Sequence, residues 1–287
     1  MAYPSVALAR QRPLQPIKQA IAAEVVAIFN DRARGERPVK RRPDGLFGPG
    51  SVAWRVHGDV TSMMVGGVAG LLLQMLHPKV LAGVWDHSRF RDDMQGRLRR
   101  TARFIALTTY GGREEAEAAI ERVRRIHGQV SGVLPDGTPY HANDPALLAW
   151  VHVTETTTFL GAWLRYGRSA LTGAEQDRYF AEMAQVGAAL GADPVPRGRA
   201  EAALILRAMR PELRYDERTA EIARALLQRR ASSLAVEPLQ RLTMQAGVDL
   251  LPEWARRMHG LPSPKLSRPL VRGGTLAIAR TLRWAFS

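Results

Sequence analysis

Residues 144–167 have the sequence DPALLAWVHVTETTTFLGAWLRYG, and both the start and the apolar body of a helix can be recognised in it. Asp144 belongs to the residue types that cap helix N-termini, and Pro145 suits the first helical position. The residues that follow are mostly apolar, with one histidine, His152, and a run of threonines. The segment predicts a core helix over residues 145–166, with His152 about two turns from its start.

Outward from this helix, the rest of the chain also has the spacing of helices. Residues 172–175, TGAE, have the form of a capping box that opens a helix over 173–190. Further helices are expected at 15–30, 60–76, 78–88, 92–109, 113–130, 199–209, 216–230, 237–248 and 274–285. No convincing alternating strand is expected. The fold class predicted is all-α, a single domain built by helix-on-helix packing.

Composition excludes several kinds of site. The chain has 287 residues and no cysteine, so zinc fingers, iron–sulfur clusters, thiolate-ligated haem and cysteine nucleophiles are excluded. The serine-hydrolase elbow, the P-loop, HExxH and paired Glu-x-x-His motifs are also absent from the sequence. Any metal must be held by His, Asp, Glu, Tyr or Met.

The basic charge lies at the two ends of the chain. The net charge is +14, yet residues 1–43 hold nine Lys/Arg against three acids, and residues 254–287 hold seven Lys/Arg and no acid. We therefore divide the chain into an N-terminal helix and basic connector (1–45), a helical body (46–253) and a basic C-terminal segment (254–287). Nucleic acid is not the expected partner, because such a groove usually places its positive surplus in the folded body. Contact with anionic lipid through the ends is a possible partner interaction.

Two features bear on location. The first residues have no apolar stretch after their basic residues, unlike a secretory signal. The apolar run Met63–Leu76 is too short to span a bilayer and is interrupted by Gln74, so we expect a core helix there. The expected location is the cytoplasm. The sequence does not indicate an oligomeric state.

His152 has two interpretations from the residues alone. In the first, it is a core histidine that bonds a helix carbonyl or Glu155. In the second, it is an axial metal ligand, because a neutral imidazole offers the single nitrogen lone pair that a haem iron requires. Small side chains nearby, Thr156 among them, would let a flat macrocycle approach the helix.

Residues 97–104, RLRRTARF, contain a second group of polar side chains. Helical spacing places Arg97, Arg100, Thr101, Phe104 and Thr108 on one face. One interpretation is a solvated basic face; the other is a polar patch directed at an anion or at bound dioxygen. The remaining histidines are weaker candidates. His77, before Pro78, is expected to cap its helix, and His87 follows Asp86 in a turn. We expect surface or turn positions for the other four: His57, His127, His141 and His259.

Four stretches together resemble a known family of haem-dependent oxygenases, which includes MpaB and latex clearing protein (rubber oxygenase). They are GLFGPGSVAWRVHGD, LLLQMLHPKVLAGVWDHSRFRDD, GRLRRTARFIALTTYGG and the stretch quoted first, and they span roughly residues 46–191. The resemblance implies an all-α domain around a pocket for non-covalent haem b, with His152 as the proximal iron ligand. It also implies that Arg97, Arg100 and Thr101 are catalytic pocket residues, with Arg97 and Thr101 in contact with the haem. Helical spacing adds Phe104, and the small side chains beside His152 add Thr156, as further expected contacts of the haem.

This chain departs from the family pattern at two places. The family has Arg-x-x-Lys-Thr in the pocket, and here Arg100 replaces the lysine; arginine stays protonated and is a poor iron ligand. No acid occurs between Leu71 and Val84, where a catalytic glutamate for rubber cleavage would be sought.

The resemblance implies an enzyme that uses dioxygen or a peroxide to oxidise an apolar small molecule. Cleavage of a carbon–carbon double bond in an isoprenoid-like chain is the implied reaction. The alternatives are dehydrogenation, hydroxylation or oxidative coupling on the same haem, or a haem-free helical protein that binds anionic lipid or nucleic acid through its basic ends.

Overall fold

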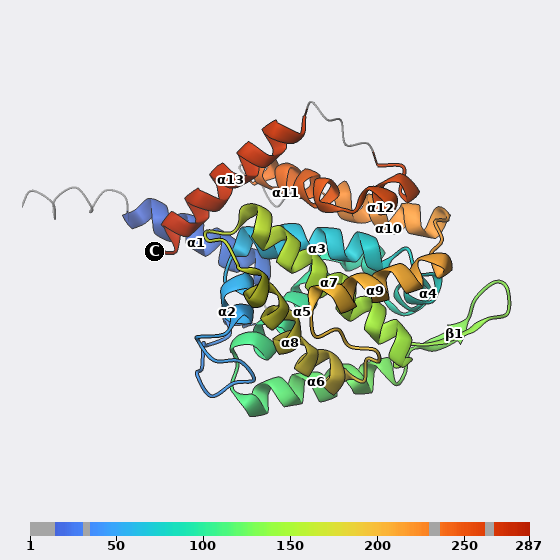
Figure 1. Cartoon of the computed structure of the whole chain (residues 1–287). Helices are drawn as coiled ribbons and strands as arrows, with labels where there is room; N and C mark the ends of the chain where they lie inside the picture. The colour runs from blue at the N-terminus through green and yellow to red at the C-terminus, as the bar shows by residue number, and fades with distance from the viewer. Residues whose placement is uncertain (1–14, 31–34, 230–235, 262–266) are drawn as a thin grey trace, which may run out of the picture.

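A computed structural model describes residues 15–30, 35–229, 236–261 and 267–287 (Figure 1). The described residues form thirteen α-helices and one short two-stranded sheet, so the all-α prediction is confirmed. The helices are α1 Gln15–Phe29, α2 Val52–His57, α3 Val60–Gln74, α4 Pro78–His87, α5 Phe90–Tyr110, α6 Arg113–His127, α7 Pro145–Tyr166, α8 Gly173–Leu190, α9 Arg199–Met209, α10 Glu217–Leu227, α11 Glu237–Leu250, α12 Glu253–Met258 and α13 Arg268–Ala285, with a 3-10 turn, Arg210–Glu212, after α9.

Helix α7 begins and ends where the sequence predicts. The Asp144 carboxylate accepts from the backbone N–H of Ala146 at 2.9 Å. Three of the four threonines of this helix donate their hydroxyls to carbonyls of the helix itself, whereas the buried Thr157 hydroxyl has no hydrogen-bond partner among the described residues. Thr156 Oγ1 donates to the His152 carbonyl at 2.8 Å, and Thr154 and Thr158 do the same four residues back. These hydroxyls are therefore satisfied inside the core, where an unpaired one would cost free energy.

The centre of the molecule is the crossing of α3 with α7 (Figure 1). Glycines on α3 allow the close approach. A Cβ at Gly66 would lie 2.6 Å from Phe159 Cδ1, and a Cβ at Gly70 would lie 2.9 Å from Thr158 Oγ1. Helix α11 packs on α3 from the other side, and α8 and α9 pack on α7. The short Gly-rich sequence in α3 therefore serves helix packing.

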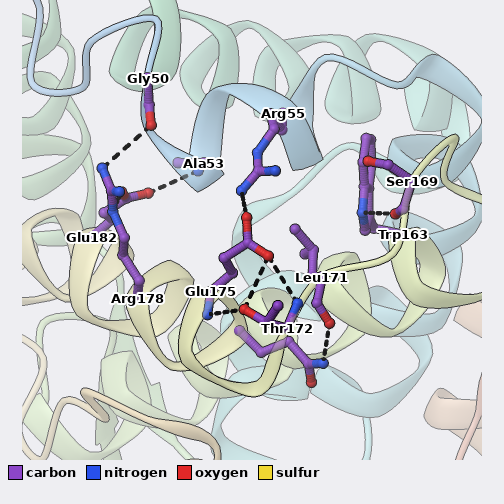
Figure 2. A network of polar contacts seen from close by, with 11 residues as sticks. Gly50, Ala53, Arg55, Trp163, Ser169, Leu171, Thr172, Glu175, Arg178 and Glu182 are labelled. Carbon is purple, nitrogen blue, oxygen red and sulfur yellow. Dashed lines mark hydrogen bonds and ion pairs between the residues drawn. The ribbon is translucent and has the colours of Figure 1, made fainter.

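Helix α2 is fastened to α8 by a polar network (Figure 2). The TGAE capping box is confirmed, with Thr172 as N-cap and Glu175 at the third helical position. Glu175 also pairs with Arg55 of α2, and Glu182 accepts from the backbone N–H of Ala53 at 2.8 Å. These contacts fix α2 beside α8, and α2 ends at His57.

The basic C-terminal helix α13 packs on α1, α3 and α11. It is held by two buried acids. Asp249 of α11 accepts from Arg272 at 2.8 Å and pairs with Arg268 at 3.3 Å, and it also accepts from Arg165 of α7 at 3.0 Å. Asp59, the N-cap of α3, accepts from Arg283 at 2.7 Å. The arginine surplus seen in the sequence is therefore partly consumed in joining α13 to the body.

The structure corrects the sequence analysis in several places. The expectation of no strand was wrong: β1 Ser131–Val133 pairs antiparallel with β2 Pro139–His141. Strands of three residues are too short for alternation to reveal them. Helices α2 and α12 have six residues each and were not predicted, and α13 begins at Arg268 rather than at 274. Residues 1–14 and 31–34 of the predicted N-terminal segment lie outside the described residues, as does residue 230 of the predicted helix 216–230.

Among the described residues, no single helix is long and apolar enough to cross a membrane. Helices α3 and α4 pass that test only as a pair, and they are bent by 105° at their junction. Helix α3 is largely buried in the structure, as expected for a core helix.

Candidate active site

His152 is buried in α7 and has no hydrogen-bonding partner for its side chain within the described parts of the chain. It is 6% exposed, and its Nε2 is enclosed without a hydrogen bond. Burial lowers the pKa of His152 to about 4, so the imidazole is neutral near pH 7. Gly187 of α8 lies directly against the ring, because a Cβ there would come within 2.9 Å of Cε1. A core histidine normally pairs its nitrogens; this one holds a free lone pair in a fixed ring.

Glu155 lies one helical turn after His152 on the same side of α7. Burial raises the pKa of Glu155 to about 7, and yet the side chain keeps some accessible surface. The Glu155 carboxyl is therefore surrounded by protein but not fully sealed from solvent. Within the described residues it forms no ion pair and no hydrogen bond through its carboxyl group. The side chain is therefore available to a ligand or to the imidazole.

A buried polar triad connects α2, α5 and α8, and it lies close enough to Glu155 for that charge to act on one of its members, Tyr179. His57 Nδ1 lies 2.7 Å from Thr109 Oγ1, and His57 Nε2 lies 2.9 Å from the Tyr179 hydroxyl. Burial lowers the pKa of His57 to about 3, and burial followed by the charge of Glu155 raises the pKa of Tyr179 well above its usual value. The surface position expected for His57 was wrong, because VAWRVH forms a short buried helix that the sequence did not reveal. His259 is buried as well.

Solvent reaches the inner face of α5 near its middle. Met94, Thr101 and Thr108 are seven residues apart and point in nearly the same direction. Met94 and Thr108 are buried, whereas Thr101 between them is exposed. The neighbouring Leu98 and Phe104 are only partly buried although they pack against the main core. The core is therefore incomplete beside these turns of α5.

Arg97 is an unpaired cation at the same part of α5. Burial, with a smaller contribution from Arg100, lowers the pKa of Arg97 to about 10. Among the described residues no carboxylate pairs with it, and His127, whose pKa burial lowers, is a second basic group near it. Arg97 is only partly buried, yet a largely enclosed guanidinium without an acid is costly unless an anion is bound. Arg97 is thus the residue of this helix best suited to hold an anionic group.

The other predicted pocket residues are placed as follows. Arg100 is exposed and its Nη1 lies 3.4 Å from Asp93 Oδ2, which is not an orientation toward the core. Thr101 donates to the Arg97 carbonyl at 3.3 Å, and Phe104 packs against the core. Thr156 is fully buried and its hydroxyl is used by the His152 carbonyl. Spacing therefore grouped residues that the structure separates into an inward set, Arg97 and Phe104, and the outward Arg100.

These residues fit a haem better than a bare metal ion. Among the described residues no group of three or more His, Asp or Glu side chains could hold a metal ion. A macrocycle supplies most of the ligands itself and needs one imidazole, which His152 offers with a free nitrogen. Its carboxylates need cations, and Arg97 is a cation for which the described structure shows no acid partner.

Residues 54–284 match the family model of the catalytic domain of the ER-bound oxygenase mpaB/B′ and rubber oxygenase. The chain belongs to this family. The resemblance carried by the four stretches is confirmed, and the matched region includes the candidate site and most of α13. Membership in the mpaB/rubber oxygenase family makes the protein an enzyme of the oxygenase type. Searches of curated proteins and of solved structures found no match.

Proposed function

We propose that the protein is a haem b-dependent oxygenase that oxidises an apolar small molecule, with His152 as the proximal iron ligand. The observation that carries the proposal is the neutral, buried imidazole of His152 without a hydrogen-bonding partner in the described structure. When bound, haem supplies the redox chemistry that activates dioxygen or a peroxide. Family membership supports this chemistry, because it names an oxygenase domain.

The chain's own residues would perform four tasks. His152 holds its lone pair in a fixed direction because Gly187 packs on the ring. Glu155 accepts or donates a proton beside that ligand, since its pKa is about 7. Arg97 pairs with a propionate of the haem. The partly buried Phe104 provides an apolar surface for the substrate.

Cleavage of a carbon–carbon double bond in an isoprenoid-like chain is the proposed reaction. Dehydrogenation, hydroxylation or oxidative coupling of a small metabolite is the second candidate. It is kept because no acid occurs between Leu71 and Val84, where a catalytic glutamate for rubber cleavage would be sought. Product analysis separates them, because cleavage yields two carbonyl fragments whereas coupling joins two molecules.

The test of haem binding is an absorption spectrum of the purified protein after expression with ample haem. We expect a Soret band that is lost or strongly reduced in His152→Ala. His141→Ala is the matched control, because His141 is exposed on β2 and its replacement should leave the band unchanged. A wild-type protein that folds but shows no Soret band would overturn the proposal.

A further inference from the structure

Two neighbouring hollows lie between α7, α9 and α12 and share the Trp254 side chain as a wall. The first has a volume of about 540 Å³ and a mainly apolar lining that includes Leu73, Leu164, Leu206 and Leu250, with Thr157, Thr158 and Arg165 as its polar members. The second also has about 540 Å³ and is lined by Arg207, Arg210, Pro211, Trp254, Arg257 and Met258. Each volume is within the range of small-molecule sites.

These hollows are separate from the candidate active site. Gly161 lines the first hollow and lies nine residues after His152, which places it on the opposite side of α7 on an ideal helix. Thr157, five residues after His152, lines the same hollow. A ligand there would therefore occupy the far side of the helix from His152.

The second hollow is cationic and has no acid in its lining. Arg257 makes an exposed ion pair with Glu253 at 3.4 Å, a kind of pair that contributes little. Arg207 and Arg210 have no carboxylate partner in the part of the chain that the structure describes. The Arg210 guanidinium lies over the Trp254 indole at 4.7 Å, which orients its planar group at the junction of the two hollows. Arginine binds carboxylates through two parallel hydrogen bonds.

The first hollow leaves apolar side chains in contact with water. Leu164 is 48% exposed, although it lines a concave surface beside Leu206 and Leu250. Covering such surface with an alkyl chain would contribute roughly 25 cal/mol for each Å² buried. One side of Trp254 therefore favours an alkyl chain, and the other favours an anionic head.

We propose that the two hollows form one binding site for a single-chain anionic amphiphile, a long-chain carboxylate, with its chain along the leucines and its head on Arg207, Arg210 and Arg257. The charge of the second hollow selects the head group, and the leucine lining of the first selects the tail. The site does not depend on haem, so it can be tested whether or not the proposed function holds.

The experiment is a titration of the full-length protein with monomeric oleate, measured by calorimetry below its micelle concentration. We expect saturable binding that weakens about tenfold or more in Arg207→Gln/Arg210→Gln, about 1.4 kcal/mol. Leu164→Gln should also weaken it. The matched control is Arg113→Gln, an exposed arginine of α6 that should leave binding unchanged.

Three results would overturn the proposal. Equal binding of a neutral long-chain alcohol would show that the arginines do not recognise the head. Binding of acetate as tight as that of oleate would show a plain anion site. Co-sedimentation with anionic vesicles that depends on these arginines, without binding of monomeric oleate, would show a membrane surface instead.

Discussion

Replacing Gly187 by alanine tests whether α8 seats the His152 imidazole. The added Cβ would lie 2.9 Å from Cε1 and 3.0 Å from both Cδ2 and Cγ of the ring. Three contacts this short require the ring or the helix to move, and such overpacking costs about 1–3 kcal/mol. Alanine in a helix gains about 1 kcal/mol over glycine, so the expected net loss in the free energy of unfolding is about 1 kcal/mol. A displaced ring should also weaken haem binding by about tenfold, or about 1.4 kcal/mol.

Gly161→Ala provides the matched control. Its Cβ would lie 3.5 Å from Leu250 Cδ1, an ordinary contact, so the variant should gain up to about 1 kcal/mol of stability and keep its haem affinity. Urea denaturation of the haem-free proteins gives the stabilities, and absorbance titration with haem gives the affinities. If Gly187→Ala proves as stable as Gly161→Ala and binds haem as tightly as wild type, the proposed seat for the imidazole is wrong.

Two further predictions concern buried charges. The pKa of Glu155 is about 7 in the folded protein against 4.5 ordinarily, so the folded state holds a proton that the unfolded state has lost between these values. The free energy of unfolding of the haem-free protein should therefore fall as pH rises from 4.5 to about 7, and Glu155→Gln should remove that part of the slope in urea titrations; an unchanged slope would contradict the burial of this carboxyl. Asp249→Asn should destabilise the protein by about 1–3 kcal/mol, less than for a fully buried pair because its arginines are partly exposed. An unchanged urea midpoint would show that α13 is held by its other contacts instead, the Asp59–Arg283 pair among them.

The sequence predicts the long helices because their ends carry chemical markers. Asp144 and the Thr172–Glu175 box act locally, so the positions of α7 and α8 follow from neighbouring residues alone. Short elements depend on tertiary contacts instead. Helix α2 has a local cap, since Ser51 Oγ accepts from the Trp54 N–H, but its place beside α8 depends on Arg55 with Glu175 and on Ala53 with Glu182, partners more than a hundred residues away. No local pattern reveals such contacts.

The candidate site likewise contains residues that the local sequence reveals and residues that only tertiary contacts bring together. His152 is recognisable in the sequence because it interrupts an apolar helix, and Arg97 because it begins a polar stretch. The triad around His57 is not recognisable, since its members come from three helices: His57, Thr109 and Tyr179. Helical spacing also placed Arg100 on the same face of α5 as Arg97, although Arg100 is exposed and forms an ion pair with Asp93 at the surface. Spacing gives direction around one helix, but only the surrounding helices decide how far the interior extends.

His152 and Arg97 each carry a cost that a haem would remove. In the described structure His152 holds an unpaired nitrogen in the core, and the partly buried Arg97 has no acid partner. A haem brings an electron-accepting iron for the first and carboxylates for the second. Because such a ligand binds only the folded state, haem at about a thousandfold excess over its Kd should raise the free energy of unfolding by about 4 kcal/mol. We expect that rise in wild type, a smaller one in Arg97→Gln and little or none in His152→Ala, each measured by urea denaturation with and without haem. Equal rises in all three proteins would place any bound haem away from these residues.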